Sequence, residues 1–157
     1  MSSLLSPEQK QLIEDGHSLL EWVKSCPAGS PPRCRDGFSD YSFLVAPFAK
    51  AYEGFLKRLF LRLGLINKRQ YNSDRFRVGK VLNPALRHKS WSVYRKLEDL
   101  GETGQRIADH LWQAWKQGRN LIFHYFPHNL HRINLKEAEE RINAILAAIQ
   151  EAELLIK

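Results

Sequence analysis

The stretch that decides the fold reads FAKAYEGFLKRLFLRLG, from Phe48 to Gly64. Its large apolar side chains recur at steps of three or four positions, and they are Phe48, Tyr52, Phe55, Leu59 and Leu63. This spacing places them on one face of an α-helix, and the glycine that follows is suited to a C-terminal cap. We therefore expect a helix from about Asp40 to Leu63 that buries one side.

The residues before this stretch predict one more helix and a loop. Residues 6–9, SPEQ, combine a capping serine, a proline at the first helical position and a glutamine that closes a capping box. The helix they start should run to about Lys24. Glycine and proline interrupt residues 26–40, which should form a surface loop. Cys26 and Cys34 lie in it at a spacing typical of neither a zinc site nor a disulfide framework, so we expect free thiols.

The residues after Gly64 predict further helices. Residues 65–89 show no sustained period, and their structure stays open. A short helix capped by Ser90 should reach Leu100, and a longer one, broken from it by two glycines, should end near Ile122. Pro127 prevents a regular helix just before it. The last helix should run over 135–156.

These patterns together predict an all-α fold, a helical bundle of four or five helices. A chain of 157 residues with 43% apolar content is long enough for one core. We expect a single domain over 1–157, with an N-terminal helix and loop in 1–39 and the core region in 40–157.

Positive charge is concentrated in the middle of the chain. Residues 41–100 carry thirteen basic and four acidic side chains, a net charge of +9, whereas the whole chain carries +7. Such a concentration favours a polyanionic partner, because neutralising phosphates releases bound counterions. A solvated helical face is the simpler explanation of the same charge, so composition alone does not decide between them.

The N-terminus has neither a charged lead-in nor a long apolar run, so no signal peptide is visible. No window approaches the roughly 20 apolar residues that a membrane-spanning helix needs. We therefore expect a soluble, cytoplasmic protein without a membrane partner.

Residues 118–124, GRNLIFH, hold the most informative polar pair. Arg119 and His124 are five positions apart, which on an unbroken helix separates two side chains by about 140° around the axis. A distortion before Pro127 would be needed to bring them together. From the residues alone, the simpler explanation is that Arg119 is a cation at a helix end and His124 a packed ring at a bend.

This motif resembles that of the HEPN superfamily, an arginine, a polar residue and, a few residues later, a histidine. Arg119, Asn120 and His124 match it. The segment 51–57, AYEGFLK, looks like the one that supplies an acidic residue in bacterial toxins of the RNase LS type, and Glu53 is the position that carries over. The resemblance covers roughly residues 40–157. It implies a homodimer that cleaves RNA without a metal or other cofactor. We therefore expect an endoribonuclease of toxin or antiviral type, with an antitoxin or another regulatory protein as a partner.

The residues suit the chemistry that the resemblance implies. The 2′-OH of RNA must lose a proton as it attacks the phosphorus, and the leaving 5′-oxygen must gain one. An imidazole such as that of His124 titrates near neutral pH and serves either step. The guanidinium of Arg119 matches the charge on the phosphoryl oxygens. Glu53 could hold Arg119 or orient His124. Asn120 is expected to form a positioning hydrogen bond rather than take part in the chemistry.

The RNA itself should contact the basic segment. The side chains that we expect to bind it are Lys57, Arg58, Arg62, Arg75, Arg77 and Lys80. Glu53 has a competing interpretation, an exposed salt bridge with Lys50 or Lys57.

Three other interpretations compete with a ribonuclease. A metal site built from His124, His128 and His131 is disfavoured, because no acidic residue lies between Asp109 and Glu137 to complete it. A non-catalytic helical module would bind nucleic acid or a partner protein through the basic segment. An antitoxin-like or scaffold protein would bind a partner and no nucleic acid.

Overall fold

The computed structural model describes residues 2–27, 37–124, 127 and 131–156. The α-helices are α1 (Pro7–Ser25), α2 (Ser42–Arg62), α3 (Lys68–Tyr71), α4 (Val78–Val81), α5 (Val93–Glu98), α6 (Glu102–Trp115) and α7 (Leu135–Ala152). Single turns η1 (Pro84–Leu86) and η3 (Glu153–Leu155) are 3₁₀ helices, and η2 (Lys116–Asn120) is a π-turn. The described residues contain no strand, which confirms the all-α class. Of the expected four or five helices, four are long, and three more are single or double turns.

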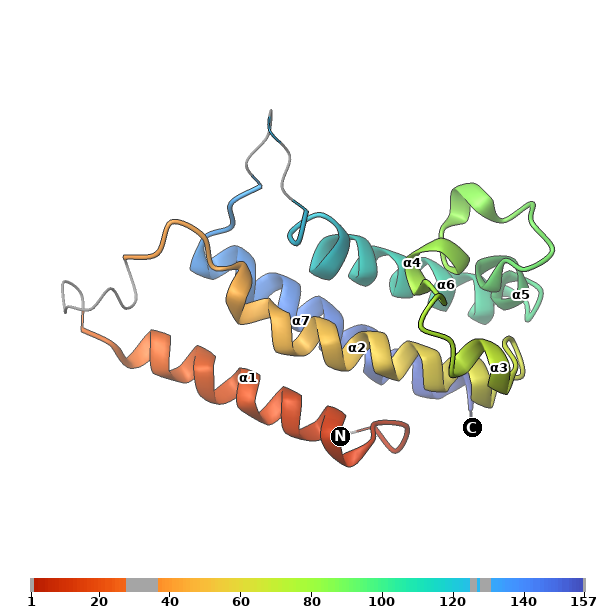
Figure 1. Cartoon of the computed structure of the whole chain (residues 1–157), viewed down its shortest axis with the longest axis horizontal. Coiled ribbons are helices and arrows are strands. Elements are labelled where there is room, and N and C mark those ends of the chain that lie inside the picture. The colour runs from red at the N-terminus through yellow and green to blue at the C-terminus, as the bar shows by residue number, and fades with distance from the viewer. Residues whose placement is uncertain (1, 28–36, 125–126, 128–130, 157) are drawn as a thin grey trace.

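The bundle is built around α2, the helix whose pattern decides the fold. In Figure 1, α1 runs antiparallel along one side of α2, while α7 and α6 lie on its other side. α6 runs in the opposite direction to α7. The short helices α3, α4 and α5 gather at the end of the molecule where α2 finishes (Figure 1).

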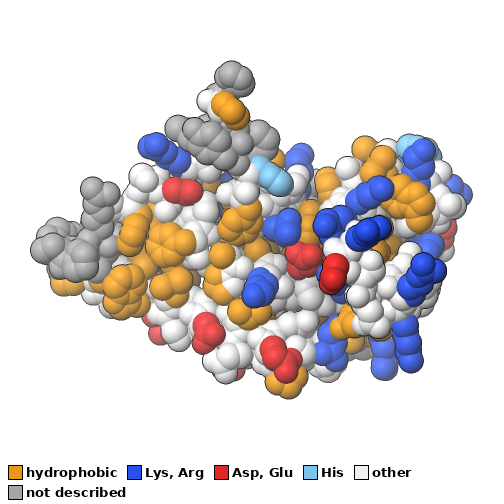
Figure 2. Space-filling view, in the orientation of Figure 1, with side chains coloured by type: hydrophobic (Ala, Val, Ile, Leu, Met, Phe, Trp, Pro, Cys, Tyr) orange, Lys and Arg blue, Asp and Glu red, His pale blue; other side chains and the backbone are white. Residues whose placement is uncertain are grey.

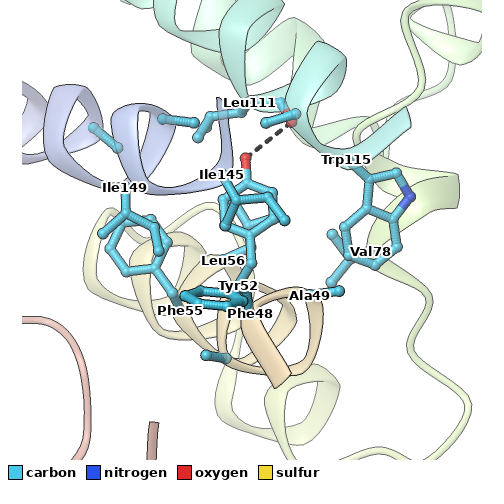
Figure 3. Packing of buried hydrophobic residues seen from close by; sticks show 14 of the residues in the cluster. Phe48, Ala49, Tyr52, Phe55, Leu56, Val78, Leu111, Trp115, Ile145 and Ile149 are labelled. Atoms are coloured by element: carbon cyan, nitrogen blue, oxygen red, sulfur yellow. Dashed lines mark hydrogen bonds between the residues drawn. The ribbon is translucent and has the colours of Figure 1, made fainter. Parts of the chain in front are cut away.

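The predicted apolar stripes meet in one core. The α2 residues Phe48, Tyr52, Phe55 and Leu59 are fully buried. They pack against the apolar faces predicted for α6 and α7 (Figure 3). Those faces include Leu111 and Trp115 on α6 and Ile145 and Ile149 on α7. Tyr52 Oη donates a hydrogen bond to Leu111 O at 2.9 Å, which links α2 to α6 inside the core. Burial of such side chains is the main stabilising contribution.

The helix ends follow the local sequence closely. Ser6 and Gln9 form a capping box at the start of α1, and Asn134 and Glu137 form another at the start of α7. Gly64 follows α2 with a φ of +68°, as expected for a C-terminal cap.

The start of α2 lies two residues later than predicted, because Asp40 precedes the helix and its side chain accepts hydrogen bonds from backbone amides. Its Oδ1 accepts hydrogen bonds from Ser42 N at 3.1 Å and from Ile133 N at 3.2 Å. Tyr41 N donates to Ile133 O at 2.9 Å. These bonds join the start of α2 to the residues just before α7.

Three expectations were wrong in detail. Ser92, not Ser90, caps α5, and that helix ends at Glu98 rather than Leu100. α6 ends at Trp115 and continues as the π-turn, so it does not reach Ile122 as a regular helix. Cys26 is disulfide-bonded rather than a free thiol; Cys34 lies outside the described residues.

None of the helices in the described ranges combines the length and the apolar character required to cross a membrane.

Candidate functional site

The π-turn at the end of α6 sets the direction of the Arg119 side chain. Leu121 N donates to Lys116 O at 3.0 Å, which closes a turn wider than that of an α-helix. Gly118 allows this turn to lie against α7, because a Cβ added there would stand 2.6 Å from Ile145 Cδ1. Arg141 on α7 holds the turn from outside, where its Nη1 donates to Gln117 O at 2.6 Å and to Gln117 Oε1 at 3.0 Å.

Arg119 leaves this turn and forms an ion pair with α2. Its Nη2 lies 3.2 Å from Glu53 Oε2, and the two side chains are 38% and 27% exposed. Lys57 lies on the other side of the carboxylate, with its Nζ 3.8 Å from Glu53 Oε1. Glu53 therefore neutralises one of the two cations, and the cluster keeps a net positive charge that solvent can reach.

The indole ring of Trp115 lies against one face of the Arg119 guanidinium. Arg119 Cζ lies 4.8 Å from the centre of that ring, within the range of a cation–π contact. The ring is buried, and α4 covers its edge, because a Cβ on Gly79 would lie 2.5 Å from Trp115 Nε1. The stacking and the ion pair together fix the guanidinium in one place.

His124 and Asn120 flank this cluster in sequence. Asn120 is the last residue of the π-turn and is half-buried. Phe123 N donates a hydrogen bond to Arg119 O at 3.3 Å, which closes a turn over residues 119–123. His124 lies in the bend that follows this turn. His124 is exposed to solvent. The regular helix ends before Arg119, in the π-turn, and residues 121–124 between Arg119 and His124 form a turn and a bend rather than a helix.

The predicted RNA-binding residues occupy different surroundings. Lys57 is held by Glu53, while Arg58 and Arg62 lie further along α2. Arg77 Nη1 donates to Asp74 O and to Phe76 O, so it stabilises its own loop. Lys80 lies 5.1 Å from the centre of the Trp91 ring.

Lys and Arg side chains crowd the end of the visible face that holds α3, α4 and α5, whereas apolar side chains are more frequent at the other end (Figure 2). Much of the basic charge of residues 41–100 therefore lies at one end of the molecule. Of the predicted site residues, Glu53 and Arg119 are in direct contact.

Sequence reasoning missed two residues that shape the site. Trp115 was not among the expected site residues, although a tryptophan four positions before an arginine was an available signal for stacking. Arg141 gave no signal, because its contact with Gln117 depends on how α7 packs against α6.

No group of three or more His, Cys, Asp or Glu side chains that could hold a metal ion occurs in the part of the chain that the structure describes. His128, one of the three histidines considered for such a site, lies outside that part. No protein family, no curated protein and no solved structure matches the chain.

Proposed function

We propose that the protein is a metal-independent RNA endonuclease of HEPN type, in which Arg119 and His124 act on the scissile phosphate and Glu53 positions Arg119. The observation that carries the proposal is the Arg119–Glu53 ion pair at 3.2 Å. The family resemblance selected these two residues from separate segments, and they lie together in the folded chain.

The geometry supports a phosphate-binding role for Arg119. Glu53 and the Trp115 ring hold the guanidinium at its side and its face, and part of the fork stays exposed to donate to phosphoryl oxygens. A preorganised cation stabilises developing negative charge without reorganising during the reaction. An arginine free to rotate would lose much of this advantage.

His124 completes the proposed reaction as the group that moves protons. It either takes the proton from the 2′-OH as a base or gives one to the departing 5′-oxygen as an acid, and a second copy of the site supplies the other step in a homodimer. The phosphorus gains the bond to the 2′-oxygen and loses the bond to the 5′-oxygen, which leaves a 2′,3′-cyclic phosphate. Asn120 positions the substrate. We further propose that an antitoxin or another regulatory protein restrains this activity in the cytoplasm.

The decisive experiment incubates the pure protein with total cellular RNA, with and without EDTA. We expect cleavage in both conditions, products ending in a 2′,3′-cyclic phosphate, and loss of cleavage in Arg119→Ala and in His124→Ala. His88→Ala removes another exposed histidine and is the matched control, because it should cleave as the wild type does. Light scattering should give the mass of a dimer.

Cleavage that survives His124→Ala, or that EDTA abolishes, would contradict the proposal. Tight and salt-sensitive RNA binding with intact strands would favour the alternative, a non-catalytic helical module that binds nucleic acid. The basic end of the molecule (Figure 2) is the observation that favours this second function.

A further inference from the structure

An open pocket of about 370 Å³ is lined by α3 and the loop after it, and α3 packs beside the C-terminal end of α2 (Figure 1). The pocket falls within the size range of ligand sites, roughly 300–1,000 Å³. Its described lining comes from α3 and from the loop that leads to α4, and consists of Asn67, Arg69, Gln70, Ser73, Arg75 and Phe76. We name it the α3 pocket.

The neutral polar groups of the α3 pocket have their oxygen atoms already engaged by the backbone. Asn67 Oδ1 accepts from Gln70 N at 2.8 Å, and Gln70 Oε1 accepts from Asn67 N at 2.9 Å. Ser73 Oγ accepts from Arg75 N at 3.2 Å. Because an amide or a hydroxyl whose oxygen is engaged still has N–H or O–H groups to give, these three side chains present mainly donors to a ligand.

Two arginines add positive charge to these donors. Arg69 and Arg75 are exposed, and neither forms an ion pair within the described ranges. None of the described lining residues is acidic. The accessible lining of the pocket is mostly apolar, but its lining residues also carry hydrogen-bond donors and two guanidinium groups, which match the oxygens of a phosphate, since these only accept.

We infer that the α3 pocket binds a backbone phosphate of single-stranded RNA, at a distance from the linkage that is cut. This inference rests on the proposed function for its substrate. Glu53 and Arg62 are separated by about 14 Å along α2, at about 1.5 Å per residue. The α3 pocket lies near that end, so a strand of roughly four stacked nucleotides, at about 3.4 Å each, covers the distance between the two sites.

The test measures binding of a short single-stranded oligouridylate by fluorescence anisotropy over a series of salt concentrations. Every protein in the series also carries His124→Ala, so that the RNA stays intact. Arg69→Ala/Arg75→Ala should weaken binding about tenfold, the factor that corresponds to about 1.4 kcal/mol. The slope of log K against log salt should fall by about 0.7 for each phosphate that the variant no longer neutralises.

The control is Lys24→Ala/Lys136→Ala, which removes the same amount of charge from two exposed lysines, each of them paired with a glutamate of α7. They lie at the end of α1 and the start of α7, at the end of the molecule opposite α3 (Figure 1). Arg69→Lys/Arg75→Lys should restore most of the salt slope, because it restores the charge. The difference between wild type and the alanine variant should shrink with oligonucleotides shorter than about four residues, which when stacked at about 3.4 Å per nucleotide do not span both sites.

The outcomes separate this inference from the proposed function. An unchanged salt slope in Arg69→Ala/Arg75→Ala, or a decrease no larger than that of the control, overturns the phosphate pocket even if the wild-type chain cleaves RNA. Binding of inorganic phosphate to the pocket without any effect of the variant on oligouridylate affinity also overturns it. A reduced slope in a chain that cleaves no RNA supports the pocket and contradicts only the nuclease.

Discussion

Arg119 Nη2 lies 3.2 Å from Glu53 Oε2, and the same guanidinium lies over the ring of Trp115. One partner comes from the middle of α2 and the other from the last turn of α6. The guanidinium is thus held at its side by an ion pair and at its face by an aromatic ring.

Glu53→Gln should remove the charge that holds Arg119 and leave the shape of the side chain unchanged. We expect the catalytic rate constant for RNA cleavage to fall about tenfold, because the transition state loses a preorganised cation. Stability should fall by no more than about 1 kcal/mol, because the pair is partly exposed to solvent. The kinetics of RNA cleavage and thermal unfolding measure the two effects.

The control for that change is Glu98→Gln, which breaks the Arg87–Glu98 ion pair on α5. It should leave the catalytic rate constant unchanged. If both variants lost activity equally, Glu53 would have no special relation to the site.

Gly118→Ala should destabilise the protein by about 1–3 kcal/mol, since the new methyl group would stand 2.6 Å from Ile145 Cδ1. Ile145→Val removes that atom. In a chemical-denaturation cycle, the cost of Gly118→Ala should therefore be smaller in the Ile145→Val background than in the wild type. If the losses of unfolding free energy in the two single variants were strictly additive in the double variant, Gly118 and Ile145 would not be in tight steric contact.

Arg141→Lys should loosen the π-turn without unfolding the bundle. Arg141 Nη1 donates to both oxygens of Gln117, and the lysine side chain is one bond shorter, so its ammonium would not reach them from the same backbone position. We expect faster hydrogen exchange at the Leu121 amide, which closes the turn, and lower RNA cleavage with little change in the midpoint of thermal unfolding. Lys136→Arg, an exposed change on the same helix, is the control and should alter neither quantity. Unchanged exchange at Leu121 in Arg141→Lys would refute this role.

Tyr52→Phe should cost about 1 kcal/mol of unfolding free energy at neutral pH, because it deletes the buried hydrogen bond to Leu111 O. It should also change the response to alkali. Burial raises the pKa of Tyr52 well above 10, and the pKa of Tyr94 is raised too, first by burial and then by its bond to Asp109.

A raised folded-state pKa gives stability that is complete below the unfolded value near 10 and is lost as the pH rises above it. The wild type should therefore lose stability above pH 10 more steeply than Tyr52→Phe does, by up to about 1.4 kcal/mol for each pH unit. Denaturation series at several alkaline pH values measure this difference, and parallel curves for the two proteins would be the contrary result.

Local sequence patterns were sufficient for much of the fold. The capping boxes at Ser6 and Asn134 and the apolar period from Phe48 onward depend on neighbours within a turn of one helix, so one chain segment contains all the information. The positive charge of residues 41–100 was equally visible. The sequence did not show which of these cations is paired, as Lys57 is with Glu53, and which lines a pocket, as Arg75 does.

The parts that could not be predicted are those in which two segments meet. A helix reaching Ile122 was the reasonable expectation for α6, and the π-turn that replaces its end is held by Ile145 and Arg141 on another helix. Residues 65–89 do contain one local signal, the capping box of Asn67 and Gln70, but no local pattern shows that these two residues line a pocket together with Arg75 and Phe76.

The sequence by itself determined the helices, their buried faces and the identity of the charged groups, because propensity, capping and periodicity act over a few residues. Only the tertiary structure decided that Glu53, Trp115 and Arg119 meet. That meeting depends on the packing of α2, α6 and α7, and packing is a property of contacts between segments far apart in the chain.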